Sequence, residues 1–180
     1  GVLGSGEAVE VPPLPTQQLL SDIRQRDTEG RTWAKTELGM VHYRQYNKEA
    51  LASHSLVVLV HGLSIPGVKH MAQMAAALAS RGLPVLVLDL FGRGLSDRPL
   101  VRYDGDLYTR CVVGLLRALD LDRRPVDLLG FSMGGQIIQE IVVRHPDLVR
   151  RMVFCAPAGT NDVDAPTPVR LAALSYGLAL

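Results

Sequence analysis

Cysteine is scarce in this 180-residue sequence, and neither sign of charge predominates. The two cysteines, Cys111 and Cys155, lack the close spacing to histidine or to another cysteine that zinc and redox motifs require. Lysine and arginine together number 19, against 18 aspartates and glutamates. This balance excludes general binding to a phosphate backbone or to an anionic membrane surface. We therefore expect no metal, no nucleic-acid partner and two buried free thiols.

Long hydrophobic runs are also missing. The longest, residues 55–60 and 83–88, fall far short of the about 20 residues that cross a bilayer, so no transmembrane segment is expected. The sequence begins at Gly1 without the charged start and apolar stretch of a secretory signal, which makes the cytoplasm the default compartment. With 47% hydrophobic and 21% charged residues, the composition is typical of one globular domain.

The first part of the chain differs from the rest in its pattern of apolar residues. Residues 1–30 predict a lead-in segment that starts with many prolines and glycines and contains one short helix over 17–27. Residues 31–38 and 40–46 then predict an antiparallel hairpin that turns at Gly39, because apolar and polar side chains alternate along them.

From Ser55 onward, short apolar runs alternate with stretches of helical period. The runs predict four strands, over residues 55–60, 84–89, 125–130 and 151–156. The stretches between them predict three helices, over residues 68–81, 107–119 and 134–145. This alternation indicates the α/β class, with a doubly wound, mostly parallel sheet covered on both faces. We place the core of the domain at residues 31–156.

The most specific motif is Gly130-Phe131-Ser132-Met133-Gly134-Gly135, which follows an apolar strand and precedes a helix. This pattern is typical of a nucleophile elbow, a sharp strand-to-helix turn that lifts the central serine clear of the sheet. The turn requires glycines two positions to either side, here Gly130 and Gly134. The helix that follows points its free backbone N–H groups toward Ser132 and favours negative charge there.

Two other interpretations of this motif are weaker. A glycine-rich turn with an incidental serine fits the residues alone but ignores the flanking strand and helix. A dinucleotide-binding turn would use Gly130 and Gly135 as its first and third glycines. However, Ser132 then occupies the second glycine position, and the next strand ends in Cys155 and Ala156 instead of a ribose-binding acid.

A second motif, His61-Gly62-Leu63, ends the first apolar run. A single histidine after a strand is more often a structural hydrogen-bonding residue than a catalyst, and we interpret His61 in that way. A loop beside the nucleophile can aim a backbone N–H at the same oxygen, and two such donors form an oxyanion hole. The N–H groups of Leu63 and Met133 are the expected donors.

A third motif spans residues 89–99 and contains Asp89, Gly92, Gly94, Ser96 and Asp97. Its glycines are too few and wrongly spaced for a phosphate-binding loop. Taken in order, the three motifs resemble the α/β-hydrolase superfamily over roughly residues 31–156, in its serine-nucleophile, esterase- or lipase-like form.

The resemblance implies a role for each matching residue. Ser132 matches the nucleophile, the N–H groups of Leu63 and Met133 match the oxyanion donors, and His61 with Gly62 matches a structural turn. The loop that begins at Asp89 matches one that shapes the floor of the site. Asp89 as the acid of a catalytic triad is a weaker alternative, because that acid usually follows a later strand. No cofactor is implied.

The nucleophile also restricts the reaction. Dehalogenases and epoxide hydrolases of the superfamily carry aspartate where this chain has Ser132, so hydrolysis of an ester, thioester, amide or carbon–carbon bond remains. Leu63, Ile65, Pro66 and Met133 indicate an apolar pocket, which fits a small-molecule substrate with an apolar acyl part. The oligomeric state stays open.

The sequence departs from the family in one respect. Members that it resembles carry the triad in the order serine, acid, histidine, yet His145 is the only histidine after Ser132. His145 ends the helix that leaves the elbow and should point away from the serine. We expect the acid and the base to lie beyond Leu180, residues 157–180 to begin a lid with a helix from Val169, and this chain itself to be inactive. The alternative function is a non-catalytic binding or assembly module with the same fold.

Overall fold

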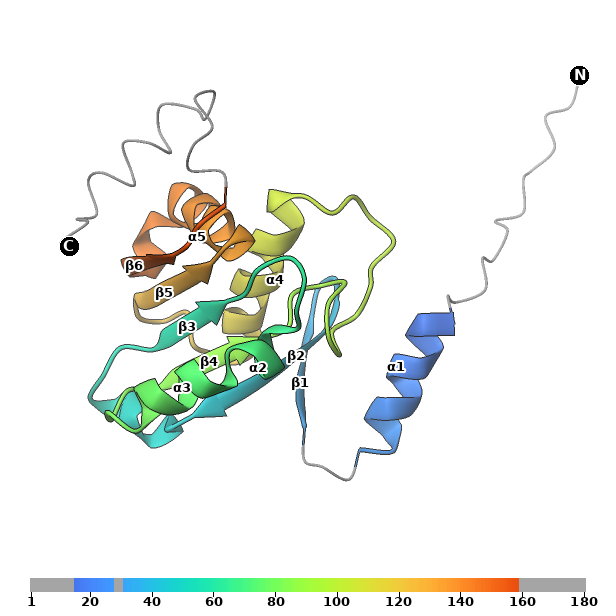
Figure 1. Cartoon of the computed structure of the whole chain (residues 1–180), viewed down its shortest axis with the longest axis horizontal. Helices are drawn as coiled ribbons and strands as arrows, with labels where there is room; N and C mark the ends of the chain where they lie inside the picture. Colours follow the sequence, from blue (N-terminus) through green and yellow to red (C-terminus); the bar gives the residue numbers. More distant parts are fainter. Residues whose placement is uncertain (1–14, 28–30, 159–180) are drawn as a thin grey trace, which may run out of the picture.

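The computed structural model describes residues 15–27 and 31–158 (Figure 1). Six strands form one sheet in the order β1-β2-β4-β3-β5-β6. The strands are β1 (Thr32–Thr36), β2 (Gly39–Tyr46), β3 (Val57–Val60), β4 (Val85–Leu88), β5 (Val126–Phe131) and β6 (Val149–Cys155). The helices are α1 (Pro15–Gln25), α2 (Gly67–His70), α3 (Ala72–Ala79), α4 (Gly105–Ala118) and α5 (Met133–Arg144), with short 3-10 turns η1 (Lys48–Ala52) and η2 (Pro146–Leu148).

The sheet is parallel where the sequence predicted it. Strand β3 pairs in parallel with β4 and with β5, and β5 pairs in parallel with β6. The hairpin of β1 and β2 joins this unit through an antiparallel pairing of β2 with β4. The predicted α/β class, the four parallel strands and the hairpin at Gly39 are therefore confirmed.

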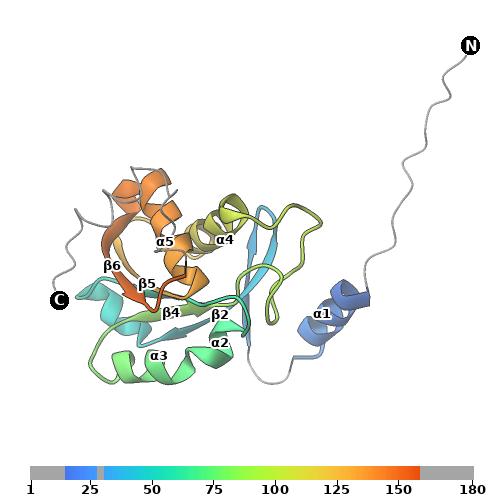
Figure 2. The ribbon, with the colours of Figure 1, turned by 45° about the horizontal axis from the view of Figure 1, so that its top comes forward.

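Helices cover both faces of the sheet, as a doubly wound fold requires (Figure 2). On one face, Val58 and Val60 of β3 lie in a large core cluster with residues of α4 and α5. On the other face, Leu59 packs with Met71 and Ala75 at α2 and α3. Because neighbouring side chains of a strand point to opposite faces, a run that is apolar at every position can serve both cores.

The predicted helix over 68–81 is in fact two helices. The chain bends at Met71, whose φ is −97° and ψ is 7°, between α2 and α3. The backbone hydrogen bonds continue around the bend, from Met71 N–H to the Gly67 carbonyl and from Ala75 N–H to the Met71 carbonyl. Met71 itself is buried in the smaller core cluster. The apolar residues keep the spacing of one continuous helix across the bend, which explains why the bend could not be predicted.

The lead-in segment is only partly described. Its helix α1 begins two residues before the predicted range of 17–27 and ends two residues before its end. The helix contacts the rest of the domain: Leu20 is buried, and the Gln17 side-chain amide donates a hydrogen bond of 3.0 Å to the Arg98 carbonyl. The expectation for residues 1–14, and that for a lid with a helix from Val169, lie outside the described residues. The domain boundaries stay predictions.

The two cysteines are both free, but they differ in burial. Cys111 lies fully inside the core on α4, where burial raises the pKa of its thiol to about 12. Cys155, at the end of β6, is only half-buried, so the expectation of two buried thiols is wrong for this one. Strand β6 pairs only with β5 among the described strands, which leaves its side chains less covered than those of a central strand.

Within residues 15–27 and 31–158, no helix has the length and apolar character that a membrane crossing would need. The same residues contain no group of three or more metal-ligating side chains that could hold an ion.

Candidate active site

Ser132 occupies a one-residue turn between β5 and α5. Its φ of 52° and ψ of −119° lie in a backbone region that residues other than glycine rarely adopt. Hydrogen bonds fix this backbone: Ser132 N–H donates to the Cys155 carbonyl, and the Ser132 carbonyl accepts from Gly135 N–H and Ala158 N–H. The sharp strand-to-helix turn predicted at Ser132 is therefore confirmed, and the end of β6 helps to hold it.

Glycines on either side allow the turn to be this sharp. A Cβ atom at Gly130 would lie 2.4 Å from the Gly134 carbonyl oxygen. A Cβ atom at Gly134 would lie 2.1 Å from the Val60 carbonyl oxygen, at the end of β3. Any larger residue at either position would push α5 away from the sheet. This close packing explains the spacing of glycines that the sequence motif shows.

The turn opens onto a hollow of about 230 Å³. The hollow is lined by Gly62, Leu63, Ser64, Ile65, His70, Phe131 and Ser132. Strands β3 and β5 are neighbours in the sheet, so the loop that leaves β3 comes directly beside Ser132. A Cβ atom at Gly62 would lie only 3.1 Å from the Ser132 Cβ. Leu63 and Ile65 are 55% and 45% exposed, which gives the hollow an apolar wall open to solvent.

The two expected oxyanion donors are unpaired. Neither Leu63 N–H nor Met133 N–H has a hydrogen-bond acceptor among the described residues. Met133 is the first residue of α5, where the partial positive charge of the helix is concentrated. Its side chain packs against the large core cluster and not on the hollow, so the predicted apolar pocket contains Leu63 and Ile65 but neither Met133 nor Pro66.

His61 is fully buried, and both of its ring nitrogens are occupied. Leu90 N–H donates to His61 Nε2 at 2.9 Å, which requires that nitrogen to be unprotonated. The proton therefore lies on Nδ1, which donates to the Gly62 carbonyl at 2.6 Å. Burial lowers the pKa of His61 below 6.5, against the opposing effect of the bond to Gly62. A neutral His61 thus ties the start of the Leu63 loop to the residue after Asp89.

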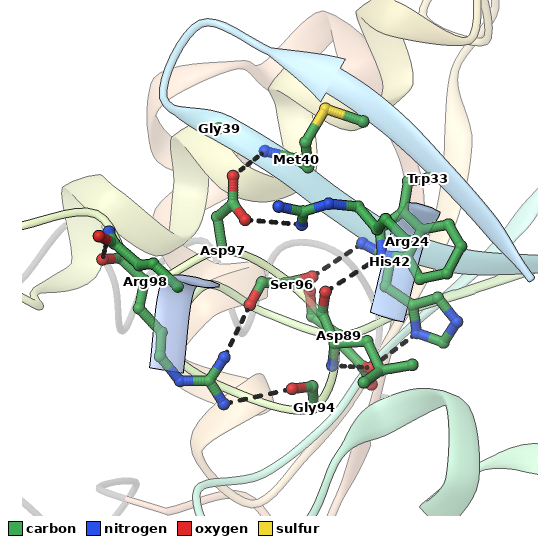
Figure 3. Close-up of polar contacts among 12 residues, drawn as sticks. Arg24, Trp33, Gly39, Met40, His42, Asp89, Gly94, Ser96, Asp97 and Arg98 are labelled. Carbon is green, nitrogen blue, oxygen red and sulfur yellow. Dashed lines mark hydrogen bonds and ion pairs between the residues drawn. The ribbon is translucent and has the colours of Figure 1, made fainter. Parts of the chain in front are cut away.

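Asp89, directly after β4, is buried, and its carboxylate makes three hydrogen bonds. His42 Nδ1 lies 2.8 Å from Asp89 Oδ2, and the carboxylate also accepts from Val68 N–H and Leu95 N–H (Figure 3). Burial alone would raise the pKa of Asp89, but these bonds, that of His42 first, bring it below its ordinary value. Ser96 adds to the group, because its hydroxyl donates to the Asp89 carbonyl and accepts from His42 N–H.

Asp89 is not placed to serve Ser132 as a triad acid. Strand β3 lies between β4 and β5, and two strand spacings amount to about 10 Å. The Asp89 carboxylate is moreover turned toward β2, where it holds His42 (Figure 3). Its contacts fix the loop of residues 89–99 against the hairpin.

The five histidines of the chain all lie in the described residues. His42 and His61 have the partners given above, and His54 contacts Ser53, the residue after η1. His145 caps the far end of the 12-residue helix α5, about 18 Å from Ser132 by helix geometry. The hydroxyl of Ser132 has no hydrogen-bond partner among the described residues.

His70 is the residue that sequence reasoning missed. It ends α2, lines the Ser132 hollow and makes an edge contact with Phe131, with ring centroids 5.2 Å apart. The sequence places His70 only a few residues after the Leu63 loop, but the bend at Met71 that makes α2 a single turn has no sequence signal. Because that loop starts beside Ser132, a helix of one turn cannot carry His70 far from it.

Comparisons with known proteins agree with this geometry. A family model described as "alpha/beta hydrolase fold" matches residues 55–177. The chain is 34% identical over 108 residues to 2-hydroxymuconate semialdehyde hydrolase from Pseudomonas sp. (strain CF600), covering 58% of this chain and 37% of that protein. It is 38% identical over 108 residues to 2-hydroxy-6-oxo-2,4-heptadienoate hydrolase from a Pseudomonas putida strain, covering 58% of this chain and 38% of that protein.

A solved structure shows the same fold. The meta-cleavage product hydrolase of Pseudomonas fluorescens IP01 superposes with a TM-score of 0.63 at 24% identity, over 72% of this chain and 46% of that one. The chain thus spans less than half the length of these relatives. The family match covers more than half of the sequence, and the sheet order, the strained serine turn and the covering helices agree with it. The chain belongs to the alpha/beta hydrolase fold family.

Proposed function

We propose that this chain carries the nucleophile of a serine hydrolase. The Ser132 hydroxyl attacks a substrate carbonyl carbon, its proton passes to a base, and the carbonyl oxygen becomes an oxyanion held by Leu63 N–H and Met133 N–H. Collapse of this intermediate expels the leaving group and leaves an acyl-enzyme on Ser132, which water then hydrolyses. The observation that carries the proposal is the strained backbone of Ser132 at an open hollow beside two unpaired N–H donors.

The other residues of the motifs serve this step indirectly. Gly62, Gly130 and Gly134 allow the serine turn and the Leu63 loop to approach each other closely. His61, in its neutral form, fixes the start of that loop. Asp89 fixes the neighbouring loop against β2 and does not act on substrate. In this proposal each of them is a positioning residue.

No base is hydrogen-bonded to Ser132 among the described residues. None of the five histidines hydrogen-bonds Ser132, and His145 lies at the wrong end of α5. We therefore propose that the triad acid and histidine are not among residues 1–180, and that this chain alone is nearly inactive. His70, which lines the hollow, is the one histidine whose position makes a direct test of this point necessary.

The proposed substrate is a small molecule with an apolar acyl part. The exposed side chains of Leu63 and Ile65 beside Ser132 support it. The names of related proteins include meta-cleavage product hydrolases and an esterase. A serine nucleophile with an oxyanion hole suits the carbonyl of an ester as well as that next to a carbon–carbon bond, so both stay open for this chain.

Labelling with a fluorophosphonate tests the proposal. The reagent should modify Ser132 faster than Ser80, an exposed serine at the end of α3 whose φ of −64° is ordinary helical backbone. Ser132→Ala should abolish the labelled peptide, and Ser80→Ala should leave it unchanged. Equal modification of the two serines would show that Ser132 is not activated.

The absence of a bonded base favours one alternative, a non-catalytic binding or assembly module with the same fold. In that case Ser132 would behave like Ser80 toward the reagent, even when a base is supplied in solution. The two functions therefore give opposite results in one experiment.

A further inference from the structure

A second hollow, larger than the one at Ser132, lies in the loop between β4 and α4. It measures about 730 Å³, within the range of small-molecule sites, and is open to solvent. It is lined by Gly92, Arg93, Arg98, Pro99, Leu100, Val101, Arg102 and Tyr103. Three of these eight residues are arginines and none is acidic. The concentration of positive charge is local, since the whole chain carries a net charge of only +1.

The charges of two arginines are not neutralised by carboxylates. Arg93 donates from Nε to the Leu63 carbonyl at 2.7 Å and from a terminal nitrogen to the Gly92 carbonyl. Arg98 donates to the Ser96 and Gly94 carbonyls (Figure 3). Within the described part of the chain, neither has an acidic group within ion-pair distance. These carbonyl contacts hold the guanidinium groups in place without cancelling their charge.

The acidic residues near this loop are engaged elsewhere. Asp97 accepts from Arg24 and from Met40 N–H, both at 2.7 Å, on the side of the loop that faces β2 (Figure 3). Asp89 is buried with His42. Asp104 lies 3.9 Å from Arg102, whose side chain is 89% exposed, and caps α4 through Leu107 N–H. Only this long contact offsets any of the three positive charges.

Tyr103 adds a polar group and an apolar ring to the hollow. Its ring occupies the space beside Gly92, where a Cβ atom would lie 2.5 Å from it. Burial raises the pKa of the Tyr103 hydroxyl, while the charges of Arg98 and Arg93 act in the opposite direction, so both guanidinium groups are within electrostatic reach of the phenol. Leu100 and Val101, 71% and 49% exposed, supply apolar surface next to these charges.

Arg93 also connects this hollow with the one at Ser132, because it lines the first and bonds to Leu63, which lines the second. We infer that the arginine hollow binds the carboxylate end of an organic anion whose apolar body lies against Leu100 and Val101. Guanidinium forks match carboxylate geometry, and the exposed apolar side chains favour a ligand with a hydrocarbon part over a simple inorganic anion. That this anion is one end of the substrate rests on the proposed function of Ser132; that it binds does not.

Binding of hexanoate to the folded chain, followed by NMR of the Tyr103 ring and the arginine Nε–H groups, tests the inference. Hexanoate should shift these signals and bind at least about tenfold more tightly than 1-hexanol, since a charge-assisted hydrogen bond is worth more than a neutral one. Inorganic phosphate should bind more weakly than hexanoate. Equal binding of hexanol would overturn the role of charge, and equal binding of phosphate would overturn the role of the apolar surface.

Variants locate the site. Arg93→Gln and Arg102→Gln should each weaken hexanoate binding by about fivefold or more and leave hexanol binding unchanged. Arg81→Gln removes the same charge from an exposed position at the end of α3 and should have no effect. Arg102 is so exposed that its variant will fold even if Arg93→Gln does not. Unchanged hexanoate binding in Arg102→Gln would contradict the inference.

Ser132→Ala separates this inference from the proposed function. Hexanoate binding should persist in that variant, because Ser132 does not line the arginine hollow. Binding of hexanoate without fluorophosphonate reaction at Ser132 would retain the anion site and reject the serine hydrolase. Reaction at Ser132 without hexanoate binding would retain the serine hydrolase and reject the anion site.

Discussion

Single residues set the geometry of the proposed site, some because they have no side chain and one because its side chain stays uncharged. Ser132 can hold a left-handed backbone because Gly130 and Gly134 carry no side chain at the points of closest approach. His61 can join two loops because it stays neutral and uses one nitrogen as donor and the other as acceptor. Both features make predictions that a single substitution tests.

Gly134→Ala should destabilise the domain by about 1–3 kcal/mol, because the new Cβ atom would lie 2.1 Å from a backbone oxygen at the end of β3. Gly114→Ala, in the middle of α4, is the matched control. Its Cβ atom would meet Thr36 at an ordinary 3.5 Å, and alanine favours a helix over glycine. Urea denaturation followed by circular dichroism gives both values. Equal effects of the two substitutions would contradict the close packing at the serine turn.

The free energy of unfolding should decrease at acid pH because of the protonation of His61. Burial lowers the pKa of His61 in the folded state below 6.5, so the unfolded chain takes up a proton first as the pH falls. The free energy of unfolding should therefore decrease as the pH drops from 7 through about 6.5 and below. His61→Gln, which keeps a donor and an acceptor but does not titrate, should remove most of this step.

The half-buried His145 provides the comparison for this measurement. Its pKa is also lowered, by burial first and then by the charges of Arg117 and Arg144. Because it is far less buried than His61, His145→Gln should change the pH dependence of the urea midpoint much less. A larger effect of His145→Gln than of His61→Gln would show that the buried histidine does not control acid stability.

At the level of strands and helices, apolar runs were sufficient to predict most of the fold. Strands β3 and β4 are buried on both faces, and a run without polar residues is the direct result. The bend at Met71 was not predictable, because both short helices keep the apolar spacing of one long helix. The pairing of Asp89 with His42 was not predictable either, because it joins residues far apart in the chain through the contact of β2 with β4.

The same limit applies to the candidate site. The elbow could be recognised because its residues are consecutive and its glycines follow from local sterics. The position of His70 in the hollow, and the convergence of Arg93 on Leu63, depend on how two loops fold over the end of the sheet. No local pattern encodes such contacts. The predicted α/β class, the parallel strands and the sharp turn at Ser132 are confirmed, whereas the roles of the site residues stay proposals.

The exposed edge of strand β6 leads to a prediction about self-association. Val153 on this strand is 52% exposed, and β6 is at the edge of the described sheet. Edge strands with exposed apolar side chains tend to pair with other chains. Val153→Lys should lower self-association of the chain, measured by sedimentation at increasing concentration. Arg151→Lys, which keeps a charge on the same strand, is the control and should leave association unchanged. Association that persists unaltered in Val153→Lys would exclude this edge as its cause.

At the scale of the whole molecule, the fold brings the Ser132 turn and two unpaired N–H groups to one end of the sheet, and no described histidine hydrogen-bonds Ser132. A positioned serine that lacks its base should retain only the about 10³–10⁴-fold acceleration over water that an oxyanion hole and binding supply. The 180-residue chain should therefore hydrolyse a simple aryl ester very slowly. Neither His70→Ala nor His145→Ala should reduce that rate. Rapid hydrolysis that His70→Ala abolishes would show that the base is within the chain.

The most direct test of the central claim is the rate at which a fluorophosphonate modifies Ser132 with and without imidazole. Imidazole in solution can take the proton that the described histidines do not reach, so it should accelerate modification of Ser132 while Ser80 stays unaffected. Peptide mapping by mass spectrometry identifies the modified serine, and Ser132→Ala supplies the blank. Preferential, imidazole-dependent labelling of Ser132 is the predicted result. Labelling of Ser132 that is no faster than that of Ser80 at any imidazole concentration would contradict the claim that Ser132 is the nucleophile of a hydrolase.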